Sequence, residues 1–236
     1  MKACFKKIML KLSGEGLSGG SGFGIDSDVV GNLAEEIAEI AKQNVQICVV
    51  IGGGNFFRGA KNACKDMDRS IADQIGMMAT VINALTFQSA LEAKGLKAKV
   101  LSGFSVPSVC DDYRFDRASE ALENGYVAIF AGGTGNPYFT TDSGAALRAV
   151  EMHCDVLMKA TQVDGVYDSD PRENPSARRF DEISYAEAIA KQLKIMDMTS
   201  MAMLRDNNIP TLIFSLKEDK SILKAVCGEG KYSIIK

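Results

Sequence analysis

The chain of 236 residues is 46% hydrophobic and 24% charged, which is enough apolar sequence to bury a sizeable core and excludes a disordered protein. Its formal net charge of −3 provides no basic surface for a nucleic-acid backbone, and no stretch approaches the roughly 20 apolar residues of a membrane span. The six cysteines form no CxxC pair, and the apolar run at residues 8–10 is too short for a signal peptide, so we expect a cytoplasmic protein with free thiols and with neither nucleic-acid nor membrane partners.

Apolar runs and helical periodicity alternate along the chain. The apolar runs predict strands at residues 5–12, 45–51, 98–101, 126–131, 155–160, 211–214 and 233–235. Apolar residues at helical spacing predict helices at residues 26–43, 66–94, 116–123, 141–152, 184–191 and 197–207, with a further short helix before the last strand. Asp26 is predicted to cap the first helix, and Gly95 to end the second. The glycine-rich residues 13–24 are predicted to form a mobile or ligand-contacting loop rather than a helix or strand, and residues 162–171 a hairpin-like loop.

This alternation predicts a single α/β domain over residues 1–236, built as a three-layer α/β/α sandwich on a mainly parallel sheet. Ligands bind such folds at the C-terminal ends of the strands, and four of the predicted strands end in glycine-rich turns. These turns lie at residues 13–14, 52–54 and 132–135 and in the loop after Lys159. The third turn leads to Asp142 at a predicted helix start, where backbone amides favour a phosphate or another anion. One such turn would more simply be an ordinary connection with a helix cap, but four of them indicate a binding site.

Charged residues lie close to these turns. They are Lys11, Arg58, Asp142, and the pair Lys159 and Asp170. Cations beside glycine turns suit phosphoryl groups, and carboxylates beside them suit Mg²⁺ or the orientation of those cations. Taken singly, each of these residues could be an ordinary exposed lysine or turn aspartate. Taken together, they favour phosphoryl transfer. A nucleoside monophosphate acceptor is already largely ionised at neutral pH, so a kinase acting on it needs no histidine base.

Known motifs limit the alternatives. Residues 54–59 have the glycine spacing of a P-loop, but Ala60 stands where the lysine belongs, and no GxGxxG sequence follows a strand. Residues 16–20 match the GxSxG pattern of a hydrolase nucleophile at Ser18, although that elbow should join a strand directly to a helix. The only histidine, His153, is predicted to lie near the C-terminus of a helix, where a structural or surface role is the more common one.

Several segments closely resemble the bacterial uridylate kinases (UMP kinases), a branch of the amino acid kinase superfamily. They are residues 11–15, 52–55 with 58–59, 67–69 with Asp73, 132–142, and 159–161 with 163–167, and they occur in the family's order between about residues 5 and 228. The resemblance implies an α/β/α fold, assembly as a homohexamer, and Mg²⁺-dependent transfer of the γ-phosphoryl group of ATP to UMP, which gives ADP and UDP in pyrimidine nucleotide synthesis.

The resemblance also implies roles for individual residues. The implied ATP contacts are Lys11, Leu12, Ser13, Gly14, Gly54, Arg58, Thr161, Tyr167 and Asp170. The implied UMP contacts are Gly53, Asp73, Thr134, Gly135, Asn136, Pro137, Tyr138, Phe139, Thr140 and Thr141. For catalysis, Lys11 and Arg58 would stabilise charge on the transferring group, and Asp142 and Asp197 are candidates for organising cations or Mg²⁺. No residue is assigned as a direct metal ligand.

The chain departs from the family in two places. Gln162 stands where the family commonly has a lysine, which gives Lys159 a larger role as a catalytic candidate. Members activated by GTP use the loop that matches residues 19–24, and here Gly20 and Ser21 replace a more polar pair. The candidate allosteric residues are Gly19, Gly20, Ser21, Gly22, Phe23 and Gly24. GTP is a candidate activator, and UTP a candidate inhibitor, on the strength of the resemblance alone.

The sequence leaves other functions open. A kinase of the same fold could phosphorylate a carboxylate or a carbamate, although Asp73 and residues 132–142 match the uridylate branch. A protein without kinase activity could be a hydrolase that uses Ser18 and His153, or a regulator that binds uridylate without turnover.

Overall fold

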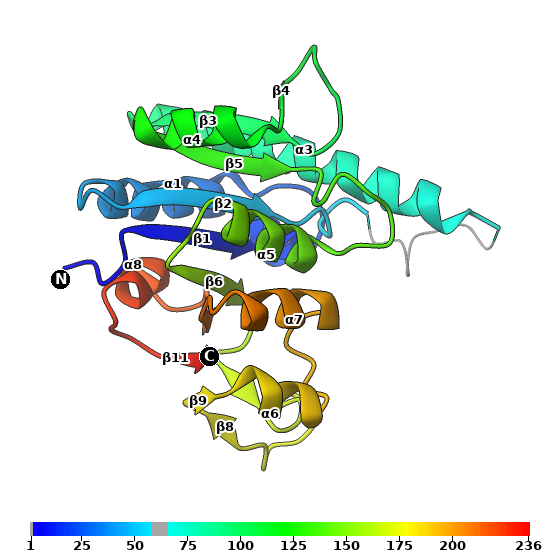
Figure 1. The fold of residues 1–236 in the computed structure, drawn as a ribbon, viewed down its shortest axis with the longest axis vertical. Coiled ribbons are helices and arrows are strands. Elements are labelled where there is room, and N and C mark those ends of the chain that lie inside the picture. Colours follow the sequence, from blue (N-terminus) through cyan, green and yellow to red (C-terminus); the bar gives the residue numbers. More distant parts are fainter. Residues whose placement is uncertain (1, 58–65) are drawn as a thin grey trace.

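A computed structural model describes residues 2–57 and 66–236 and contains a nine-stranded sheet (Figure 1). The strands are β1 (Lys7–Leu12), β2 (Gln46–Ile51), β3 (Lys97–Ser102), β4 (Asp111–Asp112), β5 (Tyr126–Ala131), β6 (Val156–Thr161), β7 (Val166–Tyr167), β8 (Arg179–Phe180), β9 (Glu182–Ile183), β10 (Thr211–Ser215) and β11 (Tyr232–Ile235). Their order in the main sheet is β4-β3-β5-β2-β1-β6-β10-β11-β9, and neighbouring strands are parallel except for β10 and β11. The strands β7 and β8 form a separate antiparallel pair.

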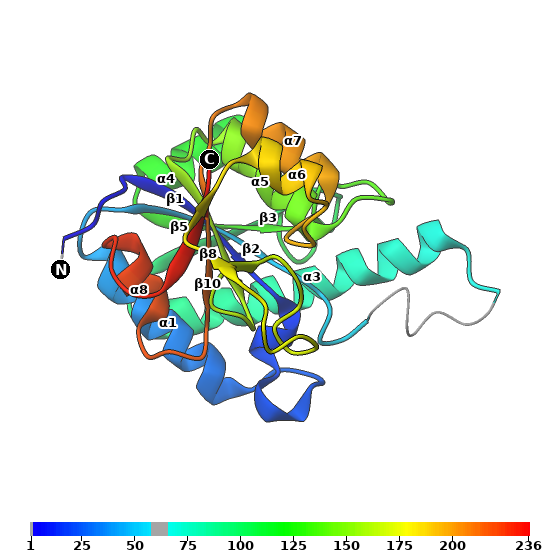
Figure 2. The same ribbon diagram turned by 90° about the horizontal axis from the view of Figure 1, so that it is seen from below.

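Helices cover both faces of the sheet. They are α1 (Ser27–Ala41), α3 (Arg69–Ala93), α4 (Phe115–Glu123), α5 (Thr141–Glu151), α6 (Tyr185–Ala190), α7 (Met198–Asp206) and α8 (Ser221–Val226), with two 3₁₀ turns, η1 (Gly14–Leu17) and η2 (Gly19–Ser21). Figure 2 shows α1, α3 and α8 on one face and α4, α5, α6 and α7 on the other. This arrangement confirms the predicted α/β/α sandwich. Within the described part of the chain, no helix is both long and apolar enough to cross a bilayer.

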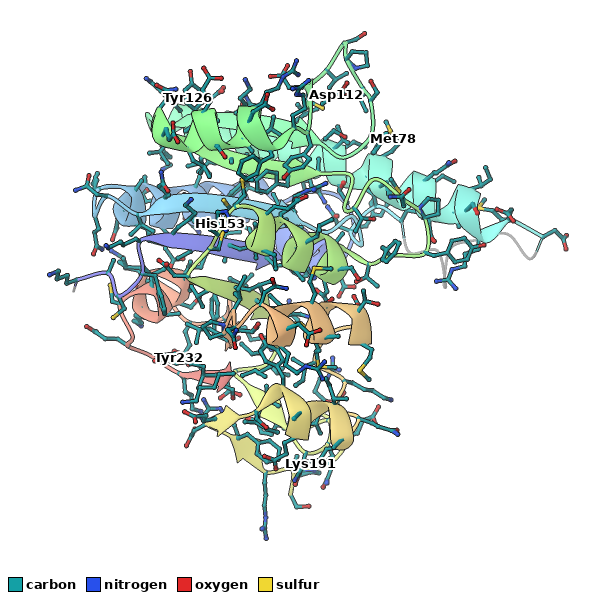
Figure 3. All side chains as sticks on the ribbon, in the orientation of Figure 1. Met78, Asp112, Tyr126, His153, Lys191 and Tyr232 are labelled. Atoms are coloured by element: carbon teal, nitrogen blue, oxygen red, sulfur yellow. The ribbon has the colours of Figure 1, made fainter. Side chains whose placement is uncertain are left out.

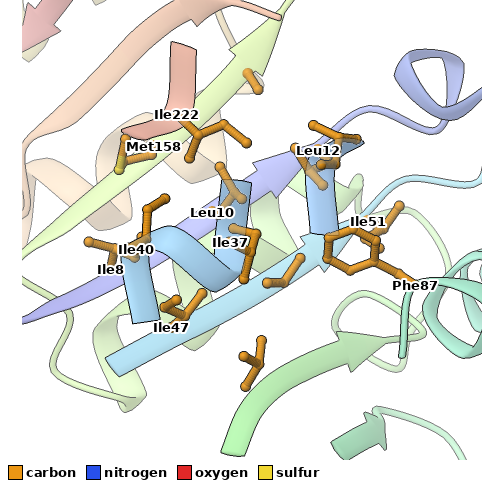
Figure 4. Packing of buried hydrophobic residues seen from close by; sticks show 14 of the residues in the cluster. Ile8, Leu10, Leu12, Ile37, Ile40, Ile47, Ile51, Phe87, Met158 and Ile222 are labelled. Atoms are coloured by element: carbon orange, nitrogen blue, oxygen red, sulfur yellow. The ribbon is translucent and has the colours of Figure 1, made fainter. Parts of the chain in front are cut away.

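Each face of the sheet has its own hydrophobic core. Alternate residues of β1 point to opposite sides of the sheet. Ile8 and Leu10 pack toward α1 and α8 (Figure 4), whereas Met9 packs toward α5. After its first residue, each of the strands β1 and β2 is buried on both faces. This explains why their sequences are nearly continuous apolar runs rather than alternating apolar and polar residues. The cysteines among the described residues are free thiols.

Local signals in the sequence fix most of the element ends. Asp26 caps α1 by accepting the N–H of Asp28 at 3.0 Å and that of Val29 at 3.2 Å, and Gly95 ends α3 with a φ of +80°. Both predictions are confirmed.

Four strands of two residues each, β4, β7, β8 and β9, were not predicted, because two residues are too few to show a period. The hairpin-like loop does exist, but its second strand lies farther along the chain, at Arg179 and Phe180.

The glycine-rich segment after β1 is more regular than predicted. It contains η1 and η2, so the expectation that it forms no helical structure was wrong. The Ser13 hydroxyl accepts the N–H of Gly16 at 3.1 Å, and the Ser18 hydroxyl donates to the carbonyl oxygen of Glu15 at 2.9 Å. Short 3₁₀ turns need only a few such bonds, so a high glycine content does not prevent them.

Candidate active site

The four glycine-rich strand ends meet at one edge of the sheet. The strands β5, β2, β1 and β6 are consecutive neighbours and all parallel, so their C-terminal ends lie side by side, as predicted from the sequence. The turns are in close contact: a side chain on Gly14 would lie 2.5 Å from the carbonyl oxygen of Gly52 and 2.5 Å from Asn55 Oδ1. Only glycine fits at position 14, because both neighbouring atoms are held in place.

Lys11, Asp142 and Lys159 form a charged centre at this edge. Lys11 on β1 and Lys159 on β6 are register partners on neighbouring strands, so their side chains leave the same face of the sheet. That face is covered by α5, whose first turn places Asp142 between the two ammonium groups. Asp142 Oδ1 lies 2.8 Å from Lys11 Nζ, and Oδ2 lies 2.7 Å from Lys159 Nζ. The centre therefore holds two positive charges and one negative charge in a nearly buried position.

Burial and charge act against each other in this centre. Burial alone would raise the pKa of the Asp142 carboxyl, but the ammonium groups of Lys11 and Lys159 more than offset it, and the pKa lies below its ordinary value of 3.8. Burial lowers the pKa of the Lys159 ammonium below 10.5; the charge of Asp142 opposes this shift and that of Lys11 adds to it. Asp142 is thus ionised at neutral pH and limits the cost of holding two ammonium groups together.

Asp197 has partners other than the cations or Mg²⁺ expected of it. It caps α7 by accepting the N–H of Ser200 at 2.8 Å, and it also accepts the hydroxyl of Thr140 and, at 2.9 Å, that of Ser143. The carboxylate therefore joins the start of α7 to the start of α5. These hydrogen bonds, together with burial that acts in the opposite direction, leave its pKa below the ordinary value. Asp197 therefore fixes two helix ends, and its charge also acts to raise the pKa of the nearby Lys159 ammonium.

The loop between β5 and α5 contains most of the residues expected to hold UMP. Gly135, with a φ of +85°, is so close to Gly103 that an added Cβ would lie 2.2 Å from its carbonyl oxygen. Tyr138 also has a positive φ of 71°, and Asp73 Oδ2 accepts its N–H at 2.8 Å. The guanidinium of Arg69 lies 4.6 Å from the centre of the Tyr138 ring. The loop is thereby attached to the first turns of α3, while the Tyr138 ring stays 58% exposed.

A cavity of about 630 Å³ lies beside the charged centre, between β6, the loop that carries β7, and the segment that joins α6 to α7. Among the residues that line it are Lys159, Thr161, Tyr167 and Asp170, together with the apolar Val163, Leu193, Ile195 and Ile213. Lys159 reaches across to the carbonyl oxygen of Ile195 at 2.6 Å. Arg172 holds the Asp170 carboxylate and lowers its pKa to about 2. Three residues expected to contact ATP are thus brought together with Lys159.

Other predicted residues lie elsewhere. Leu12 is fully buried in the core, so only its backbone could meet a ligand. The Ser13 side chain caps η1. The predicted allosteric loop, residues 19–24, is on the surface, where Phe23 is 69% exposed and its ring meets that of Phe56 edge-on with centroids 5.9 Å apart. Arg58 lies outside the described residues.

Three buried polar residues, to which the sequence assigned no role, hold the turns in place. They are Asn55, Thr80 and Asn83. The last two lie on α3, and their hydrogen bonds reach Gly52 and Gly132. A usable signal was present, because polar residues that interrupt the apolar face of a long helix need buried partners.

The structure separates Ser18 from His153. Ser18 lies beyond the C-terminal end of β1, where it is buried and donates to the carbonyl oxygen of Glu15. His153 follows α5 near the start of β6, at the opposite edge of the parallel strands, and is exposed (Figure 3). The two side chains cannot form a nucleophile and base pair, so the hydrolase interpretation is wrong.

Comparison with known proteins agrees with this geometry. The model of the amino acid kinase family matches residues 6–215. The chain belongs to the amino acid kinase family.

Within the amino acid kinase family, the chain is 49% identical over 234 residues to a uridylate kinase of Hyphomonas neptunium (strain ATCC 15444), with coverage of 99% of this chain and 93% of that protein. Its fold matches the crystal structure of UMP kinase from Ureaplasma parvum with a TM-score of 0.94 and 38% identity, over 100% of both chains. UMP kinase from Bacillus anthracis matches with a TM-score of 0.93 and 34% identity, over 98% of this chain and 96% of that one. These similarities confirm the predicted resemblance.

Proposed function

We propose that residues 1–236 act as a single domain that transfers the γ-phosphoryl group of ATP to UMP, producing ADP and UDP. The observation that carries this proposal is the charged centre of Lys11, Asp142 and Lys159 at the edge where four glycine turns meet. The nearly full-length similarity to uridylate kinases supports UMP as the acceptor.

The order of the strands supports separate binding sites for UMP and ATP. The loop that follows β5 suits UMP, and the cavity beside β6 suits ATP, because its apolar walls fit a purine ring and Lys159 fits the phosphates. The strands β2 and β1 lie between β5 and β6, so their turns, which contain Gly53, Gly54 and Gly14, separate the two substrates. Donor and acceptor would then approach the charged centre from opposite sides.

In the proposed reaction, a phosphate oxygen of UMP attacks the γ-phosphorus of ATP. One P–O bond forms, the bond to the β–γ bridging oxygen breaks, and its electron pair leaves with ADP. Lys11 and Lys159 neutralise the charge that spreads over the transferring oxygens, and Asp142 orients both lysines. The UMP phosphate is largely ionised at neutral pH, so the reaction needs no general base.

Mg²⁺ would come with the phosphates of ATP and would neutralise part of their charge. Among residues 2–57 and 66–236, no group of three or more His, Cys, Asp or Glu side chains is placed to hold a metal ion. Asp142 is paired with two lysines, and Asp197 is occupied by hydroxyls. These side chains fit a cation held mainly by phosphates and water, which is the usual mode for Mg²⁺ in kinases.

An exposed apolar stripe on α3 supports self-association. Ile71, Ile75, Met78 and Ile82 follow helical spacing and are 38–50% exposed, and Figure 3 marks Met78 among them. No charged residue occurs on α3 between Asp73 and Glu92. The cores of protein interfaces are depleted of charge, and an uncharged face can pair with its own copy without repulsion. We assign this stripe to contacts between subunits of the homohexamer.

Regulation by GTP and inhibition by UTP are proposed from the resemblance. The candidate allosteric loop is hydrogen-bonded to the turn after β2 through Gly24. The Gly24 N–H donates to the carbonyl oxygen of Asn55 at 3.1 Å, and the Gly24 carbonyl oxygen accepts from the Asn55 side chain at 2.8 Å. A ligand on this loop would act on the site through Asn55.

The test is ADP production by the purified protein with ATP, Mg²⁺ and each of UMP, CMP, dTMP, AMP and glutamate, with a no-acceptor control. Turnover with UMP far above that with the other acceptors is the expected result. Turnover with glutamate instead would favour a carboxylate kinase of the same family. Binding of UMP without turnover would contradict the proposal and favour a regulator.

A further inference from the structure

Asn83 on α3 holds the end of β2. Its side chain is fully buried and donates to the carbonyl oxygen of Gly52 at 2.7 Å and to Asn55 Oδ1 at 2.7 Å. The Asn55 amide donates back to Asn83 Oδ1 at 3.0 Å. The two amides therefore form a closed pair that fixes the turn after β2 to the helix.

Thr80 makes the equivalent connection to the end of β5. Its hydroxyl accepts the N–H of Gly132 at 2.7 Å and donates to the carbonyl oxygen of Met77 at 2.6 Å. Gly132 is the first residue after β5 and has a φ of +71°, so it starts the proposed acceptor loop. Thr80 is only 2% exposed, so its hydroxyl is shielded from solvent.

Neither side chain has a hydrogen-bond donor left for a substrate. The single donor of Thr80 is used by Met77, and both donors of Asn83 are used by Gly52 and Asn55. Both residues are buried and act on a ligand only through the turns that they hold.

The spacing of Thr80 and Asn83 sets the spacing of the two turns. The residues are three positions apart, so they lie on one face of α3, and the strands that they hold, β2 and β5, are neighbours in the sheet. The helix also packs directly on the turn: a side chain on Gly53 would lie 2.6 Å from the carbonyl oxygen of Gly76. A shift of either turn therefore requires a shift of the helix.

We propose that Thr80 and Asn83 are positioning residues that hold the two glycine turns in register and thereby set the distance between acceptor and transferring group. This inference rests on the proposed function. Thr80 holds only the acceptor loop, whereas Asn83 holds the turn with Gly53 and Gly54, which lies between both nucleotides. The two positions should therefore have different kinetic effects.

Thr80→Val and Thr80→Ser form a matched pair. Valine has the shape of threonine but leaves the buried N–H of Gly132 without a partner, whereas serine keeps the hydroxyl. We expect Thr80→Val to raise KM for UMP about tenfold and to leave KM for ATP unchanged, because an unpaired buried N–H disfavours the loop conformation that binds. Thr80→Ser should stay within about twofold of the unmodified protein in both constants.

Asn83→Asp replaces both N–H donors with a carboxylate oxygen of similar size. We expect it to raise both KM values and to lower kcat about tenfold or more, because Gly52 and Asn55 then face an acceptor. Should Asn83→Asp fail to fold, Asn55→Ala breaks the same pair from the turn and is expected to raise both KM values. Gln88→Ala is the control, since Gln88 on the same helix donates to the carbonyl oxygen of Ala98 at 3.3 Å, away from the turns, and should leave the kinetics unchanged.

Calorimetric titration with UMP accompanies the kinetics and does not depend on turnover. Weaker UMP binding by Thr80→Val than by Thr80→Ser supports the inference even if the unmodified protein fails to phosphorylate UMP, a result that would refute only the proposed function. Equal UMP affinity and equal KM values in the two Thr80 variants would overturn the inference. A loss of maximal rate that disappears when the rate is divided by the folded fraction, with both KM values unchanged, would show a purely structural role and would overturn it as well.

Discussion

Asp142→Asn removes one charge from the centre while it nearly preserves the shape of the side chain. Each lysine contact of 2.7–2.8 Å has a gross attraction above about 4 kcal/mol at an effective dielectric constant of about 20, and desolvation of the charges offsets much of it. Breaking a buried ion pair costs about 3–5 kcal/mol, and asparagine retains an oxygen for one lysine, so we expect a loss of about 3 kcal/mol of unfolding free energy. The two lysines would then repel each other, and kcat should fall on the order of 10²-fold.

The assay combines urea unfolding with ADP release at saturating ATP and UMP. Asp181→Asn is a matched control, because Asp181 also pairs with a cation, Arg179 at 2.6 Å, but its side chain is 91% exposed. That variant should change neither stability nor kcat measurably. If Asp142→Asn retains both the stability and the kcat of the unmodified protein, the charged centre is neither a structural nor a catalytic unit.

The same variant should also change how the unfolding free energy depends on pH, in a direction that the pKa of Asp142 sets. The pKa of Asp142 is lower in the folded protein than its ordinary value of 3.8, so the stabilisation that it provides is fully present above that value. It is lost as the pH falls through the folded-state pKa. The difference in unfolding free energy between the unmodified protein and Asp142→Asn should therefore be constant near neutral pH and should close below pH 3.8. A difference that widens on acidification would contradict the assigned ion pairs.

Three further changes test the surroundings of the centre. Asp73→Asn should raise KM for UMP about tenfold with little change in KM for ATP, because the Tyr138 N–H loses its charged acceptor; equal shifts in both constants would count against the assignment. Gly53→Ala should abolish turnover in a protein that still folds, since its Cβ would lie 2.6 Å from the carbonyl oxygen of Gly76, and an active variant would show that the turn can move. Ile75→Glu combined with Met78→Glu should reduce the mass measured by light scattering, because like charges would then face each other in the proposed subunit contact; an unchanged mass would place that contact elsewhere.

The sequence predicted those features of the fold that depend on neighbouring residues in the chain. Caps such as Asp26, the apolar strands and the alternation of elements were sufficient for the sandwich and for the meeting of the glycine turns. The pairing inside the site was not accessible in this way. Lys11 and Lys159 are 148 positions apart, and only the register of β1 against β6 makes them neighbours. The hydrogen bonds of Asp197 were not predicted either, because nothing local in the sequence shows that the hydroxyls of Thr140 and Ser143 reach it.

The position of β1 fits a site for the two proposed nucleotides. The first strand of the chain lies in the middle of the sheet, with β2 and β5 on one side and β6 on the other. Lys11, near the end of β1, therefore lies between the proposed acceptor side and the proposed donor side. It forms an ion pair with Asp142, which follows the proposed acceptor loop, and its register partner on the proposed donor side is Lys159. Two ammonium groups in so buried a place would repel each other without Asp142, and a single one would leave part of the phosphoryl charge uncompensated. A net positive centre with one carboxylate between two lysines is thus what the buried junction of two anionic substrates requires.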